Sequence, residues 1–376
     1  MRYFALPLVA GIGYFLLASI TIDVTDGRHS LGAIWPANAI LLSLMALQSK
    51  RKWPAILIAG FIGNAFANFL MRDVFAAPLL FGIANIAEAF IAAIGLRLAT
   101  ERNKGLFTPS SVLHFMLWAG FIAPGISAIL GGTTAWLLFN QPFWVSVTRW
   151  FLADALGLLI FSPFFTALFR GDYVRLFMEK SWPQRLEFLT LITFTATITF
   201  LLFFVVRHAM LFLITIPLML ATFRSGWLGT KTALIIVATI GSLATLSNIG
   251  PIARMTTNPE VRIYYCQIYI AATLLIQMPI AAALAARNRL IEQLKDSEHS
   301  LRLLASQSPI LLLSFDLSGT CKHVVGTTNI LLDRDADLLS GSSFSDISEE
   351  GQFELKRAHN AALDDISCAI MQNSEP

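Results

Sequence analysis

The sequence predicts a mainly α-helical protein, in which a polytopic bundle of eight to ten transmembrane helices precedes a cytoplasmic linker helix and an incomplete α+β domain. Of the 376 residues, 56% are hydrophobic and only 14% are charged, and the mean hydropathy is +0.66. Soluble domains carry about 25% charged residues, so this composition indicates an integral membrane protein. Nearly all long apolar runs precede residue 287, which suggests a membrane domain (1–286), a linker helix (287–307) and a soluble domain (308–376).

Ten apolar segments are candidates for crossing a bilayer, which takes about 20 helical residues. In order, they cover residues 3–20, 31–47, 53–71, 75–98, 111–139, 143–169, 186–206, 209–223, 229–247 and 263–286. The fifth segment is long and contains Pro124, Gly131 and Gly132, so we expect it to tilt or break there. Eight spans with additional re-entrant pieces remain the alternative.

Lysine and arginine residues predict the orientation of the membrane domain. With the N-terminus inside, Arg2 and the inner loops hold 15 basic residues, whereas the outer side holds six. Basic residues concentrate in cytoplasmic loops. We therefore expect a multi-pass protein of the bacterial inner membrane, with both ends of the membrane domain in the cytoplasm.

Composition and motifs argue against several classes of function. A net charge of +3 is too small to favour nucleic acid, and Cys266, Cys321 and Cys368 lack the spacing of a zinc site or a disulfide framework. The sequence contains no HExxH motif, no phosphate-binding Walker loop and no Ser/His/Asp arrangement. The chain as given is therefore not expected to be an enzyme.

The sixth apolar segment carries the most unusual polar residue. Asp154 lies well inside it, and a carboxylate at that depth costs about 2.5–3.5 kcal/mol unless it faces a partner or a wet cavity. Trp150, Asp154 and Gly157 are spaced four and three apart, which places them on one helix face. Three interpretations remain open: a structural seam between helices, part of a ligand or proton site, or a misplaced boundary that leaves Asp154 near the surface.

Neighbouring segments repeat this intramembrane polarity. The second begins Trp35-Pro36-Ala37-Asn38, and the third and fourth contain side chains at helical spacing: Asn64, Asn68, Asn85 and Glu88. Amides commonly join helices in hydrocarbon, but Glu88 is ionisable. We expect an inward cluster that contains Glu88 and Asp154. His114, near the start of its segment, is interpreted as a helix-end or interfacial residue.

The order of these motifs resembles the first class of bacterial membrane-associated sensor domains, abbreviated MASE, over about residues 5–285. The resemblance rests on Trp35-Pro36-x-Asn38, Trp53-Pro54-Ala55, Gly60-x3-Asn64, Asn85-x2-Glu88 and Trp150-x3-Asp154-x2-Gly157 with Pro163. It implies an integral sensory module placed before signalling domains, most often histidine kinases or cyclic di-GMP enzymes. It also implies eight spans and leaves the ligand undefined.

The linker predicts a helix that continues the last span. Leu290, Leu294, Leu301 and Leu304 follow heptad-like spacing, which favours a homodimer through a short coiled coil. An ordinary amphipathic linker helix is the alternative. Ser308-Pro309 should end this helix.

The tail resembles the beginning of a PAS domain. Two strands (310–315 and 320–325) flank an Asp316-x-x-Gly319 turn, followed by a short helix near 329–332, a helix over 352–364 and a third strand over 366–371. A PAS sheet has five strands, so we expect a fragment of a longer sensor, with dimerisation through this domain. No cofactor is identified: Cys321 lacks the context of a flavin site, and His359 is the one weak haem candidate.

Three functions are compatible with these sequence features. The preferred one is a sensory module that passes a signal from an unknown small ligand, a lipid or the bilayer to a histidine kinase or a cyclic di-GMP enzyme. The alternatives are a small-solute transporter with a regulatory tail and a membrane scaffold. The predicted ligand site or polar seam comprises Asn38, Asn64, Asn68, Asn85, Glu88, Trp150 and Asp154.

Overall fold

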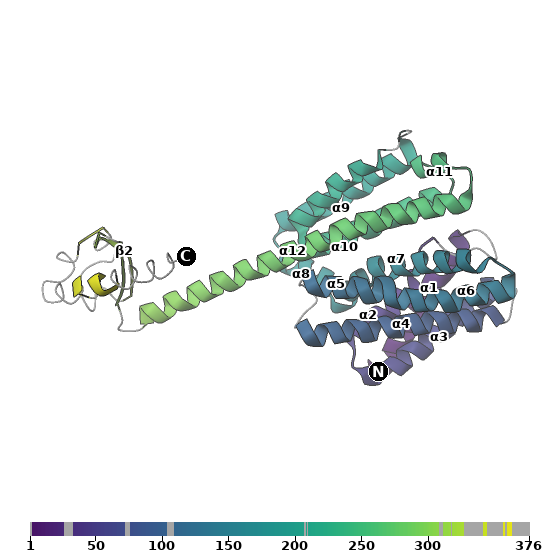
Figure 1. Cartoon of the computed structure of the whole chain (residues 1–376), viewed down its shortest axis with the longest axis horizontal. Coiled ribbons are helices and arrows are strands. Elements are labelled where there is room, and N and C mark those ends of the chain that lie inside the picture. Colours follow the sequence, from purple (N-terminus) through teal and green to yellow (C-terminus); the bar gives the residue numbers. More distant parts are fainter. Residues whose placement is uncertain are drawn as a thin grey trace, which may run out of the picture. The chain divides into compact units, whose positions relative to one another are not determined.

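The computed structural model describes residues 2–25, 33–71, 76–103, 109–206, 208, 210–307, 311–316, 318–326, 341–343, 356–357 and 359–362. The chain divides into two compact units, residues 1–287 and 288–376. The first is a helical bundle, and the second contains a small antiparallel sheet (Figure 1). The predicted short helix near 329–332 and the predicted strand over 366–371 lie outside the described residues.

The bundle is built from long apolar helices. Its α-helices are α1 (Arg2–Val24), α2 (Ala37–Leu47), α3 (Trp53–Met71), α4 (Ala76–Asn103), α5 (Pro109–Leu117), α6 (Ala123–Phe139), α7 (Phe143–Arg170), α8 (Asp172–Glu179), α9 (Trp182–Phe200), α10 (Thr215–Leu246), α11 (Pro251–Met255) and α12 (Pro259–Gln307). In the described part of the chain, eight helices are long and apolar enough to cross a membrane. This is the lower end of the predicted range.

The second predicted span is shorter than expected. Its helix, α2, has only 11 residues, because residues 35–36 are not helical and Pro36 precedes its first turn. All side chains from Ala37 to Met45 are buried, and α2 packs against α7, α4 and α1. A helix that is apolar all round and enclosed by neighbours is a core element, so α2 forms the centre of the bundle rather than one of its lipid-facing walls.

The fifth predicted span is one helical stretch with a local irregularity. The π-helical segment η2 (Trp118–Ile122) joins α5 to α6, immediately before Pro124. Such π-bulges are single turns with i→i+5 hydrogen bonds that interrupt the regular hydrogen bonding of an α-helix. The expected break therefore lies at 118–122, upstream of Pro124 rather than at the glycine pair.

The eighth and ninth predicted segments form the two arms of α10. Gly226 has φ 63° and ψ −150°, which interrupts the helix. Thr230 Oγ1 lies 3.0 Å from Thr222 Oγ1, whereas residues eight apart in a straight helix are separated by about 12 Å. A Cβ added to Gly229 would lie 2.7 Å from the carbonyl oxygen of Ala221. The chain therefore folds back on itself at Gly226.

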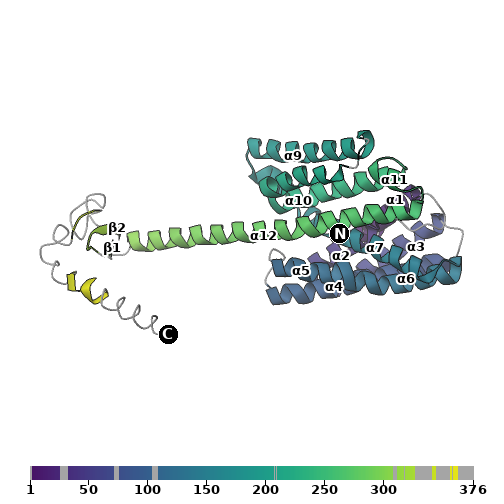
Figure 2. The same cartoon turned by 45° about the horizontal axis from the view of Figure 1, so that its top comes forward.

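Close approach of backbones fixes the packing of α1 against α3. A Cβ added to Gly63 would lie 2.5 Å from the carbonyl oxygen of Gly11, so small residues are required where these helices meet. Helices α9, α10 and α11 lie together beside the group formed by α1–α7 in both views (Figures 1 and 2).

Helix α12 has two different parts. Within the bundle, an apolar stripe is buried at fourfold spacing: Cys266, Ile270, Leu274, Met278 and Ala282. Beyond the bundle, the helix continues to Gln307, as the sequence predicted for the linker. There Leu290 and Leu294 are 66% and 70% exposed, so their apolar surface is available to a partner.

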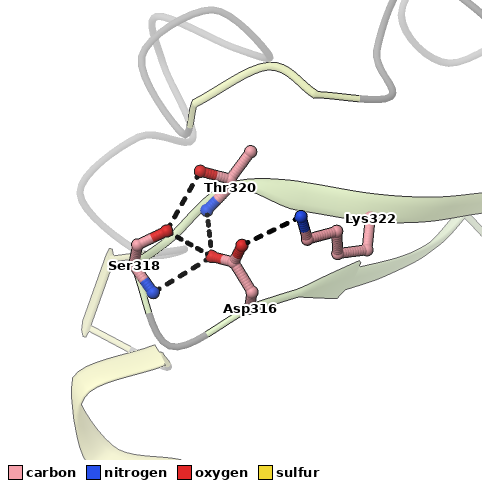
Figure 3. A network of polar contacts seen from close by, with 4 residues as sticks. All are labelled: Asp316, Ser318, Thr320 and Lys322. Atoms are coloured by element: carbon pink, nitrogen blue, oxygen red, sulfur yellow. Dashed lines mark hydrogen bonds and ion pairs between the residues drawn. The ribbon is translucent and has the colours of Figure 1, made fainter.

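The described part of the tail contains a β-hairpin. Strands β1 (Leu311–Phe315) and β2 (Cys321–Gly326) pair antiparallel, close to the predicted boundaries. Asp316 organises the turn: its Oδ1 accepts hydrogen bonds from the backbone N–H groups of Ser318 and Thr320, each at 3.0 Å, and its Oδ2 lies 3.3 Å from Lys322 Nζ (Figure 3). Residues 356–357 and 359–362 are helical, within the predicted helix. The PAS assignment of this unit stays a prediction.

Candidate functional site: a buried polar core

A backbone contact between α7 and the segment before α2 positions the site. The N–H of Trp35 donates to the carbonyl oxygen of Ala153 at 3.0 Å. A Cβ added to Gly157 would lie 1.9 Å from the carbonyl oxygen of Trp35. Only glycine permits this approach, which explains the Trp150-x3-Asp154-x2-Gly157 spacing in structural terms.

Asn38 lies at the centre of the site and contacts two other helices, α1 and α4. Its side chain is fully buried. Its Oδ1 accepts a hydrogen bond from the hydroxyl of Tyr14 at 2.7 Å, and its Nδ2 donates to Asn85 Oδ1 at 2.9 Å and to Glu88 Oε2. Because α2 starts at Ala37, this side chain projects from the first turn of a short helix in the bundle interior.

Asn64 extends the network toward α3. Its Oδ1 accepts hydrogen bonds from Asn85 Nδ2 at 3.1 Å, Asn68 Nδ2 at 3.2 Å and the Tyr14 hydroxyl at 3.2 Å. The indole N–H of Trp35 donates to the same hydroxyl at 3.3 Å. Four asparagines and two aromatic polar groups thus satisfy one another without solvent, as buried polar groups require.

The two carboxyl groups meet between α4 and α7. Glu88 is 0% exposed and Asp154 is 3% exposed, and the two carboxyl groups are close enough to interact directly. Ser127 Oγ donates to Asp154 Oδ2 at 3.4 Å and accepts from Trp150 Nε1 at 2.9 Å.

A proton must bridge these carboxyl groups for the contact to be a hydrogen bond. Ionised carboxylates only accept hydrogen bonds, and when both are counted as acceptors the buried Glu88 Oε1 has no partner. A proton held by either residue supplies the missing donor. The pair is therefore a place where one proton or one cationic group could be held.

All seven predicted site residues belong to this network, and three further side chains complete it. We use the name polar core for Tyr14, Trp35, Asn38, Asn64, Asn68, Asn85, Glu88, Ser127, Trp150 and Asp154. Tyr14 and Ser127 were not predicted, because a single tyrosine or serine in an apolar segment is common. Trp35 was noted only as part of a motif.

Two contacts join the neighbourhood of the polar core to α12. Gln267, 1% exposed, donates from Nε2 to the carbonyl oxygen of Ala33 at 2.7 Å, two residues before Trp35. Arg149, one residue before Trp150, forms a salt bridge with Glu260. Both α12 residues lie in the part of the helix that precedes the linker.

Three cavities in the described part of the chain are lined by other residues. They lie between α1 and α3, beside the residues 33–36, and at the end of α7. None of these three is lined by one of the seven predicted site residues. The polar core is a closed network in this conformation, so a ligand would have to exchange with internal hydrogen bonds.

The remaining candidates have simpler surroundings. His114 Nδ1 lies 2.7 Å from the carbonyl oxygen of Ser110, one turn earlier. The His359 ring lies 6.4 Å from the Phe315 ring centroid, and burial raises the pKa of the Cys321 thiol. Among the described residues, no group of three His, Cys, Asp or Glu side chains could hold a metal ion.

Comparisons with known proteins agree with this architecture. The probable diguanylate cyclase DgcE of Escherichia coli (strain K12) is 24% identical over 191 residues, which cover 50% of this chain and 16% of that protein. The chain therefore corresponds to a minor part of this relative's length. No solved structure matches significantly. The MASE1 profile matches residues 5–289, well over half of the 376 residues, and the chain therefore belongs to the MASE1 family of membrane-associated sensor domains.

Proposed function

We propose that this chain is the membrane-embedded sensory input module of a bacterial signalling protein and that the polar core is its switch. The observation that carries the proposal is the contact between Glu88 and Asp154, fully enclosed among hydrogen-bonded amides. Burying two ionisable groups at this depth is costly, and intramembrane carboxyl groups commonly serve ion, proton or ligand recognition.

The proposed signal is a change in the arrangement of α2 and α7 relative to α12. A ligand or proton that alters the hydrogen bonds of Asn38, Glu88 or Asp154 shifts the balance between two arrangements only if it favours one of them. The Trp35–Ala153 contact joins α2 to α7. Gln267 and Glu260 then transmit the displacement to α12 through Ala33 and Arg149.

The proposed output is cyclic di-GMP synthesis, by a catalytic domain reached through the linker helix and the tail. The similarity to a probable diguanylate cyclase supports this choice over a histidine kinase. The exposed Leu290 and Leu294 favour a homodimer, in which paired linker helices carry the change. The excess of basic residues in the inner loops supports cytoplasmic ends for the membrane domain and location in the inner membrane.

The test measures whether the polar core controls an attached enzyme. The whole chain is fused ahead of a diguanylate cyclase catalytic domain, and cyclic di-GMP is quantified in cells with Glu88→Gln and Asp154→Asn. These variants keep side-chain shape and hydrogen bonding but remove the ionisable groups. We expect each to change the output about fivefold or more, the range of ordinary allosteric coupling.

Glu187→Gln is the matched control. Glu187 pairs with Arg224 at an exposed position away from the polar core, so the same chemical change there should leave the output unchanged. The amounts of fusion protein in the membrane are compared by immunoblot. If Glu88→Gln and Asp154→Asn behave like this control, the polar core is only a structural seam.

A further inference from the structure

A cavity of about 50 Å³ lies where α7 ends, and it is independent of the polar core. Six helices contribute: α2 and α4 supply Leu42 and Leu96, α5 supplies Ser111, Val112 and Phe115, α8 supplies Asp172, and α7 and the second arm of α10 supply the rest. Most of the lining residues are apolar, and Arg170 and Lys231 are among the others. The cavity therefore combines hydrocarbon with two cationic side chains.

The charges around this cavity are not balanced. Asp172 also lines it, but its Oδ1 accepts a hydrogen bond from Arg175 Nη2 at 2.7 Å, so its charge is already paired. Lys231 Nζ lies 5.6 Å from the ring centroid of Trp227. Neither Arg170 nor Lys231 forms a salt bridge with any described residue. Two cations thus line the cavity against one carboxylate, Asp172, which Arg175 also binds.

A buried hydroxyl at the cavity wall also lacks a partner. Ser162 is 3% exposed and its Oγ makes no hydrogen bond, although its carbonyl oxygen accepts one from Ser43 Oγ at 2.9 Å. A buried donor without an acceptor costs free energy. This hydroxyl is positioned to donate to a group inside the cavity.

We propose that this cavity binds the phosphate group of an anionic phospholipid, held by Arg170 and Lys231 with Ser162 as a hydrogen-bond donor. A water molecule needs about 10–15 Å³ by the same measure, so the space fits a headgroup phosphate with few waters and not an entire lipid. The acyl chains remain in the bilayer. Basic pockets between transmembrane helices at the cytoplasmic side are suited to such headgroups, and Arg170 and Lys231 lie on the side that we propose to be cytoplasmic.

The test titrates the whole purified chain, in detergent, with three probes. Short-chain phosphatidylglycerol presents the phosphate with a net charge, phosphatidylcholine presents a neutralised one, and inorganic phosphate presents the anion alone. Thermal unfolding followed by tryptophan fluorescence reports binding as a dose-dependent shift. We expect phosphatidylglycerol to stabilise the chain and phosphatidylcholine to have little effect.

Variants then assign the binding to this cavity. Each cation contributes about 1 kcal/mol toward an anionic headgroup, or about fivefold in Kd. We expect Arg170→Gln and Lys231→Gln each to weaken phosphatidylglycerol binding about fivefold, and their combination about 25-fold. Ser162→Ala, which keeps all charges, should weaken it less. Arg51→Gln is the control, because Arg51 is an exposed cation on the same proposed side that neither lines the cavity nor pairs with a residue that does.

The outcomes separate the sources of the phosphate. Stabilisation by phosphatidylglycerol alone, lost in the cation variants, supports a lipid site. Equal stabilisation by inorganic phosphate with the same dependence on Arg170 and Lys231 supports the phosphate site and overturns the lipid as its source. Equal binding of phosphatidylcholine, an equal effect of Arg51→Gln, or no binding of any probe overturns the proposal. Size-exclusion profiles identify variants that fail to fold. If a cation variant fails to fold, weaker phosphatidylglycerol binding by Ser162→Ala tests the site in its place.

Discussion

Two buried polar clusters stabilise different parts of this bundle, and they are chemically unlike. The polar core joins α1, α2, α3, α4, α6 and α7 and contains two carboxyl groups in contact. The second cluster consists of Thr222, Thr230 and Gln277, where Thr222 Oγ1 lies 3.0 Å from Thr230 Oγ1 and 3.1 Å from Gln277 Oε1. It joins the two arms of α10 to α12 with neutral groups only.

This difference shows what helix association requires and what it does not. Hydroxyl and amide groups suffice to join helices in a membrane, where such contacts contribute about 0.6 kcal/mol on average. The Thr222–Thr230–Gln277 cluster uses nothing more. Glu88 and Asp154 exceed that need and carry a large desolvation cost, which is the reason for proposing a signalling role for them.

The largest expected loss of stability follows from replacing Asn38, at the centre of the polar core. Asn38→Leu removes the partners of Tyr14, Asn85 and Glu88, and each buried polar group left unpaired costs about 1–3 kcal/mol. Because Tyr14 still reaches Asn64, we expect a net loss of about 2–4 kcal/mol in the free energy of unfolding, measured by titration with a denaturing detergent.

Gln277→Leu is the matched substitution in the neutral cluster. It should cost only about 0.6 kcal/mol, since Thr222 and Thr230 retain backbone acceptors at Leu218 and Gly226. Equal losses for the two leucine variants would contradict the distinction between the clusters.

A smaller loss of stability is expected from disturbing the backbone contact between α7 and Trp35. Gly157→Ala places a methyl group against the Trp35 carbonyl oxygen and should separate α7 from α2, with a cost of about 1–3 kcal/mol for overpacking. Gly125→Ala is the control, because a Cβ there meets nothing within 4 Å. Thermal unfolding of both variants is compared in the same detergent. A Gly157→Ala variant as stable as Gly125→Ala would show that α7 and the segment before α2 can separate without loss of stability.

The carboxyl pair offers a sharper comparison through a double-mutant cycle. Glu88→Leu or Asp154→Leu alone leaves one buried ionisable group without its partner, whereas the double variant removes both. We expect the double variant to lose less stability than the sum of the single variants, by about 1–3 kcal/mol. Additive losses in the detergent titration would indicate that the two carboxyl groups do not interact.

The smallest effect concerns the exposed network of the tail hairpin. Hydrogen bonds from Ser318, from the Thr320 backbone and the charge of Lys322 hold the pKa of Asp316 well below its usual range. A lowered folded-state pKa stabilises the hairpin above the unfolded pKa near 4, and this contribution is lost as the pH falls.

Amide hydrogen exchange in β1 and β2, corrected for its intrinsic pH dependence, measures this contribution in the whole chain. Protection should decrease between about pH 4 and pH 2. Asp316→Asn should lower the protection at neutral pH and remove this pH dependence. A pH profile that Asp316→Asn leaves unchanged would assign the dependence to another group.

Much of the site could be predicted because intramembrane polarity is rare and costly. Asn38, Asn64, Asn85, Glu88 and Asp154 were recognised on that ground, and the structure brings them together. The sequence could not show which partners they choose, because hydrogen bonds between residues 21 to 50 positions apart depend on the packed bundle. No sequence pattern marked Tyr14 or Ser127 as part of the site.

The fold was predictable to a similar degree. Apolar length identified the helices, but it could not show that α2 has only 11 residues or that Gly226 reverses α10. Both features depend on backbone geometry at one or two residues. The linker helix was predicted from leucine spacing, whereas its proposed dimer remains a prediction.

The reversal at Gly226 has a consequence for the bilayer around this protein. The segment 211–225, which comprises the 3-10 turn Leu211–Ile214 and the first arm of α10, rises about 25 Å, less than a hydrocarbon core of about 30 Å. Its outer surface faces lipid, because Phe212, Ile216 and Phe223 are 68%, 55% and 62% exposed. Lipids beside a short apolar segment must thin to match it, at a fraction of a kcal/mol per ångström. The energy of this half of the bundle therefore depends on membrane thickness.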